Sequence, residues 1–491
     1  MKKLIALIGV LSLTISCNDD SLTDMNTDTK NPSEVPADAL LGNAEKNLFD
    51  QMTSTNVNIN VFRLFAQHWT ETTYLDESRY DILQRNIPDR QWQVLYRDVL
   101  TDLQEAKVIA NRIETVTAKE EKIKKNKIAI IEVLETYAYS VLVDTFGNIP
   151  YTESLDPQNF PSPKYDGAVD VYKDLFVKID DAIANLDSDF ASFGSADFVY
   201  SGDVAKWKKF ANSVKLRMAI TVADEPSLNP AAKFKEAFTA GVFSSSSDNA
   251  TIQYKATQPN TNPLYEDLVS SGRYDFVAAN TLVDKMNTLS DPRRPNYFIP
   301  IDGVFVGGPY AQGGDFENYS SAGDPASDGG PVTKLLDPTL EGILMNYTEV
   351  SFYLAEGVER GFISGSAASY YNQAITASIL YWGGTQLEAT TYLLQPNVAY
   401  ATATGTWKQK IGEQAWIGLY NRGFEAWTSF RRLDFPKLVA PSNAASAAEN
   451  KVPARFTYPV GEQTLNNSNY SAAATAVGGD KLSTKLFWDK F

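Results

Sequence analysis

The residues of this chain that could carry chemistry begin with its only cysteine, Cys17. Lys2 and Lys3 form a short positive segment, and the stretch 4–15 that follows is mostly apolar. A positive segment, an apolar segment and a small residue at the cleavage point are the parts of a secretory signal peptide. With Ser16 directly before Cys17, the pattern predicts a lipoprotein signal, in which residues 1–16 are removed and Cys17 receives the lipid.

The surroundings of this cysteine indicate where the chain would be held. The apolar stretch is shorter than the roughly 20 residues that a transmembrane helix needs. Acidic residues directly after the cysteine, here Asp19 and Asp20, are typical of lipoproteins exported to the cell surface. We therefore expect a lipidated tether over residues 17–35 and a location on the outer membrane, facing outward. Thr14 stands where a lipoprotein signal usually has leucine, so an ordinary secretory peptide is the alternative.

Histidine chemistry depends on one residue, His68. A single histidine leaves one candidate for a Ser–His–Asp triad and excludes a multi-histidine metal site. His68 lies between Phe65 and Trp69, near an expected helix end, so we predict a packed side chain rather than a reactive one. The sequence contains no P-loop and no glycine-rich turn between a strand and a helix, so no nucleotide cofactor is expected.

The charge of the chain disfavours one class of partner. Acidic residues outnumber basic ones 60 to 44, which gives a net charge of −16. Such a chain repels nucleic acid, so we expect no nucleic-acid partner. Four acidic residues in one glycine-rich stretch could offer calcium the oxygen ligands that it prefers: Asp315, Glu317, Asp324 and Asp328. Their spacing is not that of an EF-hand loop, so we predict no metal or cofactor, with calcium as the alternative.

A first candidate ligand-binding segment spans residues 70–87. Aromatic, hydroxyl and charged side chains alternate there without helical periodicity. Tyrosine rings can stack on a ligand while neighbouring polar groups form hydrogen bonds to it. We predict binding roles for Tyr74, Arg79, Tyr80 and Asp81. The alternative is that Tyr74 and Tyr80 only pin the loop to the body of the protein.

A second candidate segment spans residues 302–330, within an irregular insertion predicted at about 291–345. Glycine pairs recur there, at Gly307–Gly308, Gly313–Gly314 and Gly329–Gly330. Aromatic residues stand between the pairs, and long irregular loops are usually functional or disordered. We predict that Tyr310, Phe316 and Tyr319 also contact the ligand.

Helices must position these loops, because helical periodicity dominates most of the chain. Apolar residues recur at helical spacing over 99–113 and 172–186. The stretch 128–146 is nearly all apolar and is followed by Gly147, a suitable C-cap. Asp203 is a suitable N-cap for a helix whose inner face carries Trp207 and Phe210. Paired helices of this length are typical of tetratricopeptide-like repeats.

The expected organisation is one body over residues 36–491. The helical scaffold covers about 36–290 and 346–433, on either side of the insertion. A loop-rich tail covers 436–491, with Ala- and Ser-rich stretches at 442–448 and 471–476.

Several stretches together resemble the SusD/RagB family, within its SusD-like branch. The resemblance covers nearly the whole mature chain and depends on the order of the stretches: Asn31–Ser33, Tyr137–Tyr151, Gly202–Arg217, Tyr347–Glu356, Tyr420–Trp427 with Arg431–Arg432, and Pro453–Pro459.

The resemblance implies a mostly α-helical fold, in which tetratricopeptide-like helical pairs (an α-α superhelix) support an irregular, loop-rich ligand-binding part. It implies a non-catalytic lipoprotein that captures an oligosaccharide or a peptide. It also implies a partner, a SusC-like TonB-dependent barrel of the outer membrane, which would import the captured nutrient.

Two other functions stay open at this point. A surface glycoside hydrolase would use two carboxyl groups flanking a cleft, and a helical-repeat scaffold would bind only proteins. The charged residues of the later helical stretches are predicted to be structural, as buried or interhelical ion pairs: Glu349, Arg422, Glu425, Arg431 and Arg432.

Overall fold

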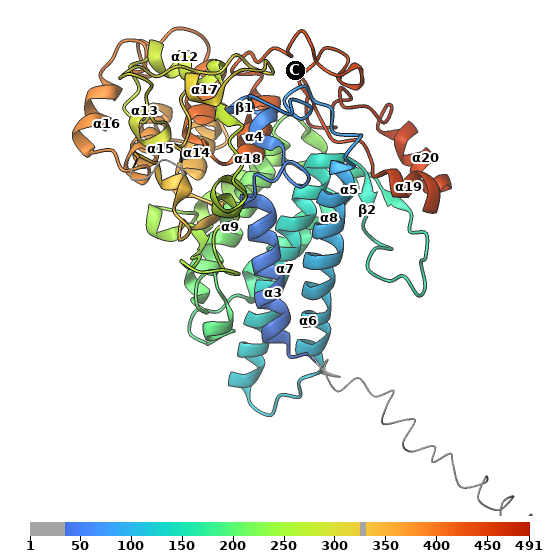
Figure 1. Ribbon diagram of the computed structural model, residues 1–491. Helices are drawn as coiled ribbons and strands as arrows, with labels where there is room; N and C mark the ends of the chain where they lie inside the picture. The colour runs from blue at the N-terminus through green and yellow to red at the C-terminus, as the bar shows by residue number, and fades with distance from the viewer. Residues whose placement is uncertain (1–34, 325–329) are drawn as a thin grey trace, which may run out of the picture.

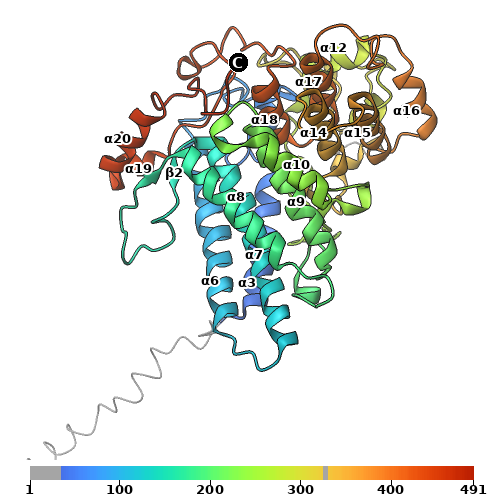
Figure 2. The ribbon, with the colours of Figure 1, turned by 180° about the vertical axis from the view of Figure 1, so that it is seen from behind.

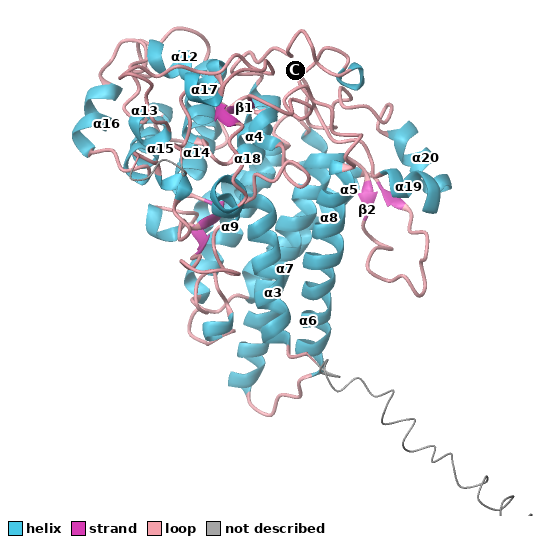
Figure 3. Ribbon diagram, in the orientation of Figure 1, coloured by secondary structure: helices cyan, strands magenta, loops and turns pink. Residues whose placement is uncertain are grey.

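The computed structural model describes residues 35–324 and 330–491, which form a mostly α-helical body, as predicted (Figures 1 and 3). The predicted signal peptide, Cys17, nearly all of the tether and Asp328 lie outside the described residues. Three small two-stranded sheets accompany the helices. The helices are α3 (Ala37–Thr53), α4 (Phe62–Phe65), α5 (Ile87–Gln93), α6 (Thr101–Arg112), α7 (Ala118–Phe146), α8 (Ala168–Asn185), α9 (Val204–Thr221), α10 (Pro230–Ala240), α11 (Pro263–Tyr265), α12 (Asn280–Thr288), α13 (Arg294–Tyr297), α14 (Tyr347–Glu359), α15 (Ala367–Tyr381), α16 (Gln386–Leu393), α17 (Trp407–Gly418), α18 (Gly423–Leu433), α19 (Val460–Leu465) and α20 (Asn467–Ala476).

The ends of the longest helices follow from their capping residues. Helix α7 begins at a capping box, in which Thr117 accepts from the Glu120 backbone N–H and the Glu120 side chain accepts from the Thr117 backbone N–H. It ends at Gly147, whose φ of 89° continues no helix. Helix α9 begins where the Asp203 side chain accepts from the Lys206 backbone N–H, 3.1 Å away. The predicted caps at Gly147 and Asp203 are confirmed.

Helices that are close in the sequence pack against each other in pairs. The pairs are α3 with α6, α7 with α8, α9 with α10, α14 with α15, and α17 with α18. Phe146, Trp207 and Phe210, the predicted core residues, are fully buried. The predicted helix over 99–113 differs from the structure at both ends. Its first residues belong to a π-helical segment, Val94–Leu100. At the other end α6 stops at Arg112, and Ile113 is exposed.

The two halves of the helical scaffold contribute to two neighbouring hydrophobic cores. Helices α3 and α6–α9 surround one core, and α12, α15 and α17 surround the other. Figures 1 and 2 show α12–α17 grouped at one end of the upper part, above and beside the long helices α3, α6, α7 and α8. Irregular segments, among them the start of the segment 70–87 next to β1, lie in the upper part of the view in Figure 1. The tail contains two short helices, α19 and α20, and the Ala-rich stretch 471–476 belongs to α20.

Buried charges connect helices that are far apart in the sequence. Arg422, at the start of α18, contacts Glu349 in the first turn of α14 and lies 2.8 Å from Glu425. Its Nη2 also donates to the carbonyl of Leu344, 2.5 Å away. Arg432 forms a buried ion pair with Glu356 of α14. These contacts confirm the structural role predicted for Arg422, Glu349, Glu425 and Arg432.

Arg431 is held in a different way from the ion pairs predicted for this group. Its Nη1 donates to the carbonyls of Asp144 and Ala454, at 2.9 and 2.8 Å. Its guanidinium carbon lies 3.3 Å from the centre of the Trp427 ring. Burial lowers the pKa of Arg431 to about 9, because the surrounding carbonyls and rings replace water only in part. The prediction of an ion pair is therefore corrected to carbonyl and aromatic contacts.

The strands are short and lie at the edges of the irregular segments. They are β1 (Trp69–Glu71), β2 (Ile149–Pro150), β3 (Tyr165–Asp166), β4 (Ala250–Ile252), β5 (Phe276–Ala278) and β6 (Gly342–Met345). They pair antiparallel as β1 with β5, β2 with β3, and β4 with β6. None of the helices in residues 35–324 and 330–491 has the length and apolarity needed to cross a bilayer.

Candidate functional site

The two predicted ligand-binding segments meet around the strand pair β1–β5. Strand β1 opens the segment 70–87, and its Thr70 stands opposite Val277 of β5. On the other side of β5, the Gly308 N–H donates to the Ala278 carbonyl and the Ala278 N–H donates to the Ser320 carbonyl, both at 2.8 Å. Segments separated by more than 200 residues are thus joined by backbone hydrogen bonds.

The glycines of the second segment allow this close contact. A side chain at Gly307 would place its Cβ 2.3 Å from the Cα of Asn280, closer than atoms can approach. The N–H of Gly314 donates to the carbonyl of Thr72, 3.1 Å away. The pairs Gly307–Gly308 and Gly313–Gly314 therefore let the loop pack closely against its neighbours, among them the segment 70–87.

Four aromatic side chains on the loops that meet at this junction are exposed or half-buried, and we call them the aromatic surface: Tyr74, Tyr274, Phe316 and Tyr319. Tyr74 is 73% exposed and Tyr274 is 37% exposed, whereas Phe316 and Tyr319 are half-buried. The Tyr274 and Phe316 rings meet edge to face, with centroids 6.0 Å apart. Aromatic rings exposed in this way can stack on the apolar face of a sugar or on another flat group.

The cavities at the aromatic surface differ in size. A hollow beside Phe316 and Tyr319 has a volume of about 220 Å³ and also contains Ile299 and Glu317. A second cavity, beneath Phe316 and Tyr274, measures only about 20 Å³. A space of that size holds no more than a water molecule. A ligand would therefore lie on the aromatic surface and enter only the larger hollow.

A polar groove borders the C-terminal end of the segment 70–87. It consists of two hollows of about 550 and 330 Å³, which share Asn56, Ile59 and Arg90. Amide and charged side chains dominate its lining, including Asn58, Gln93 and Asp50. Such groups donate and accept hydrogen bonds in the mixture that sugar hydroxyls require.

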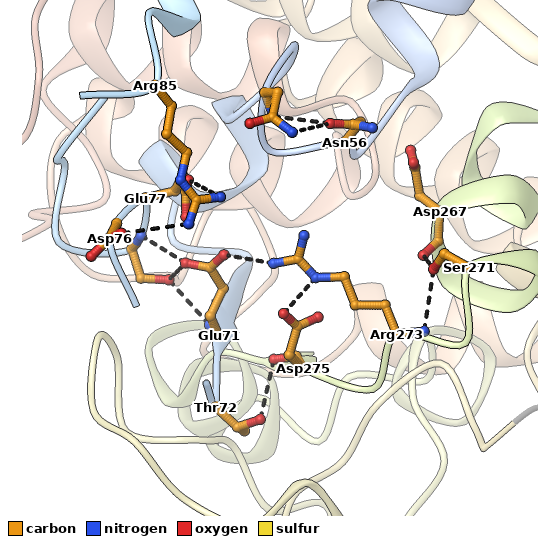
Figure 4. Close-up of polar contacts among 12 residues, drawn as sticks. Asn56, Glu71, Thr72, Asp76, Glu77, Arg85, Asp267, Ser271, Arg273 and Asp275 are labelled. Atoms are coloured by element: carbon orange, nitrogen blue, oxygen red, sulfur yellow. Dashed lines mark hydrogen bonds and ion pairs between the residues drawn. The ribbon is translucent and has the colours of Figure 1, made fainter. Parts of the chain in front are cut away.

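Arg85 connects the polar groove to the turn that carries Tyr74 (Figure 4). Its side chain lines the groove, and its guanidinium lies 3.5 Å from Asp76 and 3.2 Å from Glu77. Arg85 thus links the polar groove to the turn that follows Tyr74.

Tyr80 does not belong to the aromatic surface, and its predicted stacking role is corrected. The side chain is fully buried, and its ring meets Phe65 edge to face at 5.5 Å. Its hydroxyl accepts a hydrogen bond from Nε2 of Gln67, 2.9 Å away. Burial raises the pKa of Tyr80 to about 12. The alternative therefore holds for Tyr80, which pins the loop to the helical body.

The other predicted site residues have mixed positions. Tyr310 is half-buried, and its hydroxyl donates to the carbonyl of Leu64, 2.7 Å away. Its ring lies 6.2 Å from that of Tyr80, so its position favours a supporting role over direct stacking. Arg79 and Asp81 are half-buried, and Asp81 accepts from Nε2 of Gln84 at 2.8 Å.

Sequence reasoning missed two residues of this region, Arg273 and Tyr274. They follow the turn Ser271–Gly272 in a segment that we assigned to the helical scaffold. An arginine and a tyrosine directly after such a turn were the available signal. Arg273 points toward Glu71 and Asp275 (Figure 4).

His68 is a packed residue, as predicted. It is fully buried, and its Nε2 forms a hydrogen bond with the carbonyl of Trp416, 2.9 Å away. Burial lowers the pKa of His68 to about 3. The imidazole is therefore neutral at physiological pH and donates from Nε2, and its unprotonated Nδ1 is buried out of reach of a substrate.

The acidic residues of the described part of the chain form no candidate metal site, and the buried Glu71–Glu77 pair is closed to a substrate. Residues 35–324 and 330–491 contain no group of three or more His, Cys, Asp or Glu residues that could hold a metal ion. Asp315, Glu317 and Asp324 lie on the described part of the predicted calcium loop. Glu71 and Glu77 lie close together, but both are fully buried, so no substrate can fit between them as glycoside hydrolysis requires.

Comparisons with known proteins agree with this architecture. Residues 29–459 match the SusD-like family model described as "Starch-binding associating with outer membrane". A solved chitin-binding protein superposes with a TM-score of 0.79 at 24% identity, covering 93% of this chain and 100% of that one. No curated protein sequence matches the chain.

Two further solved structures have the same fold. A SusD homologue from Bacteroides uniformis superposes with a TM-score of 0.74 at 26% identity, over 92% of this chain and 99% of that one. A chitin-binding SusD homologue from Flavobacterium johnsoniae gives a TM-score of 0.75 at 23% identity, over 91% and 98% of the two chains.

Proposed function

The chain belongs to the SusD-like family of starch-binding proteins associated with the outer membrane, and from this we propose that it captures an oligosaccharide at the cell surface without cleaving it. The observation that carries the proposal is the meeting of two distant loops around β1–β5, which brings exposed aromatic rings together beside a polar groove. A binding protein needs such a surface, whereas a glycoside hydrolase needs two accessible carboxyl groups across a cleft.

The chemistry of the region favours an uncharged saccharide. Exposed Tyr74 and Tyr274 provide stacking platforms, and the groove offers amide groups such as Asn56 and Asn58. The net charge of −16 disfavours a polyanionic ligand over the surface as a whole. Two of the structural neighbours are themselves described as chitin-binding, which supports a glycan as the ligand class.

We further propose that the protein is held on the outer membrane through a lipid at Cys17 and passes its ligand to a SusC-like TonB-dependent barrel. The signal-like residues 1–16 and the polar stretch before α3 support the anchor. The family's association with the outer membrane supports the location. The ligand would be held at the loop-rich end of the helical scaffold and released into the barrel.

Isothermal titration of the chain starting at Asn18 tests the binding function. The panel contains chito- and malto-oligosaccharides, a uronic-acid oligosaccharide and a mixed peptide pool. We expect saturable binding to one uncharged oligosaccharide, and chromatography of the ligand afterwards should show that it is intact. Cleaved ligand would favour the hydrolase, and binding of peptides alone would contradict the saccharide assignment.

The anchor is tested by replacing Cys17 with alanine in the full-length chain. We expect the variant to lose lipid labelling and to leave the outer-membrane fraction, because two acyl chains supply most of the membrane affinity. Its thermal unfolding should match that of the chain starting at Asn18. A Ser16→Ala variant, which keeps a small residue at the cleavage point, is the matched control and should remain lipidated. A Cys17→Ala variant that still sediments with outer membranes would contradict the anchor.

A further inference from the structure

Three buried carboxyl groups lie beside the strand pair β1–β5, and we call them the carboxyl cluster: Glu71, Glu77 and Asp275 (Figure 4). Glu71 and Glu77 are fully buried, and Asp275 is 2% exposed. Burying one carboxylate without full compensation is costly, so three at one place require an explanation. Together they connect β1, the turn that carries Tyr74 and the turn that carries Tyr274.

Glu71 ties the Tyr74 turn back onto β1. Its Oε2 accepts from the backbone N–H of Ser78 at 3.0 Å and from the Ser78 hydroxyl at 2.9 Å. The Ser78 Oγ in turn accepts from the Glu71 backbone N–H, 3.1 Å away. Because Ser78 closes the turn after Tyr74, the position of this tyrosine depends on the Glu71 carboxyl group.

Arg273 ties the Tyr274 turn to the same carboxyl cluster. Its Nε lies 2.5 Å from Asp275 Oδ2, and its Nη2 lies 3.5 Å from Glu71 Oε1. The guanidinium carbon stands 5.0 Å from the centre of the Phe276 ring, which fixes its plane. Arg273 thus links the turn that carries Tyr274 to Glu71, which in turn holds the turn that carries Tyr74.

The charges of this region do not balance if every carboxyl group is ionised. Two guanidinium groups face the carboxyl cluster, Arg273 and Arg85. Arg85 also pairs with Asp76 at the surface. Two positive charges are therefore paired with three buried carboxyl groups and Asp76, and a proton on one buried carboxyl group would bring these charges closer to balance.

The Glu71–Glu77 pair is the place for that proton. Burial and the neighbouring Glu77 raise the pKa of Glu71 to about 9, and burial raises the pKa of Glu77. Glu71 accepts from the N–H of Ser78, the neighbour of Glu77, so the two carboxyl groups are held close together. Both carboxyl oxygens of Glu77 are buried without a hydrogen-bond donor among the described residues. A proton held between Glu71 and Glu77 would supply the donor that Glu77 lacks, because an ionised carboxylate has no proton to donate.

We propose that Glu71 and Glu77 share one proton, and that this pair, acting through Ser78 and Arg273, positions the two turns that carry Tyr74 and Tyr274. These are positioning residues, since none of them needs to touch the ligand. The expected effect on ligand affinity rests on the proposed function. The shared proton and the ordering of the two turns do not.

The other titratable groups near the pair define what pH can change. On the first segment they are Asp76, Arg79, Tyr80 and Arg85, and on the others Asp275, Arg273 and Tyr310. Burial raises the pKa values of Tyr80 and Tyr310, so both stay neutral while Glu71 titrates. The unfolded chain releases the Glu71 proton near pH 4.5, and the folded chain releases it near pH 9. The contribution of the pair to stability is therefore full below pH 4.5 and is lost as the pH rises toward 9.

Glu71→Gln is the informative variant, because an amide reproduces the protonated carboxyl group. Its NH₂ can donate to Glu77 and its oxygen can accept from Ser78, but it cannot ionise. Infrared difference spectra of wild type against this variant at pH 7 detect the proton directly. We expect a protonated-carboxyl stretch in the wild type that is absent in the variant and disappears from the wild type above pH 9.

Hydrogen exchange of the full-length protein, corrected for the intrinsic rate at each pH, tests the positioning role without any ligand. Between pH 7 and pH 9.5 we expect the protection of segments 72–81 and 271–276 to fall at least about tenfold in the wild type. It should stay constant in Glu71→Gln. The control Glu317→Gln, an exposed carboxyl group beside Phe316, should behave like the wild type. Glu77→Gln, whose amide can donate to an ionised Glu71, serves as a second variant if the first misfolds.

Two results would overturn the proposal: no protonated carboxyl group in the infrared difference, or equal loss of protection in wild type and both variants. If a ligand has been found, its affinity should fall about tenfold from pH 7 to pH 9.5 in the wild type and stay level in Glu71→Gln. Absence of any ligand would count against the proposed function but not against the shared proton.

Discussion

Replacing Arg422 by methionine is expected to destabilise the protein by about 3–5 kcal/mol, because the change leaves two buried carboxylates without their positive partner. Arg422 contacts Glu349 of α14 and Glu425 of α18, and all three side chains are buried. Burial makes the charge of each group depend on the others, since water cannot screen them. Chemical denaturation followed by circular dichroism measures the loss.

A matched surface variant separates this effect from the general cost of removing a positive charge. Lys437 pairs with Asp434, and their side chains are 61% and 42% exposed. We expect Lys437→Met to change the free energy of unfolding by less than about 1 kcal/mol, as for most exposed pairs. A triple variant, Arg422→Met with Glu349→Gln and Glu425→Gln, should recover part of the lost stability because no buried charge is left unpaired. Equal losses for Arg422→Met and Lys437→Met would contradict the buried-charge argument.

Tyr80→Ala is expected to lower the stability and Tyr74→Ala to lower the ligand affinity, although the two residues are only six positions apart in one loop. Tyr80 is fully buried against Phe65 and bonded to Gln67, so its truncation should cost about 3–5 kcal/mol of stability, as for other large core residues. Tyr74 is 73% exposed, so its truncation should leave the unfolding curve almost unchanged. Thermal unfolding of both variants checks the first half of this prediction.

The second half concerns the ligand found by titration. Tyr74→Ala should weaken its binding by about 1–2 kcal/mol if the ring stacks on the ligand, and Tyr74→Phe should restore most of the affinity. Val439→Ala, which truncates an apolar side chain that is 75% exposed, controls for the loss of surface area. Unchanged affinity in Tyr74→Ala would remove this tyrosine from the binding surface. Stability in Tyr80→Ala equal to the wild type would contradict its role as a core residue.

Local features of the helices could be predicted because they depend on neighbours in the sequence. The Asp203 cap needs only the backbone of Lys206, and the Gly147 cap needs only its own freedom to take a positive φ. The same reasoning failed at Ile113. Its apolar character continued the periodicity of the preceding residues, but α6 ends at Arg112 and leaves Ile113 exposed.

The residues that make up the candidate binding region could be predicted only in part. Composition correctly indicated two aromatic, irregular segments, and the structure joins them through β1 and β5. It could not separate exposed Tyr74 from buried Tyr80, because the two tyrosines have similar neighbours in the sequence. Tyr274 was missed for the reverse reason, since its segment reads as part of the scaffold.

The sequence by itself determined the helical class, two helix caps, the exclusion of a multi-histidine metal site and the membership of a family, because each depends on residue type or on spacing along the chain. Only the tertiary structure decided which residues lie together. The pairing of Thr70 with Val277, the contact of Arg422 with Glu349 and the approach of Arg273 to Glu71 all join residues that are far apart in the sequence. Such contacts are set by how the helices pack, and the burial that packing produces decides which tyrosines face solvent and which carboxyl group keeps its proton.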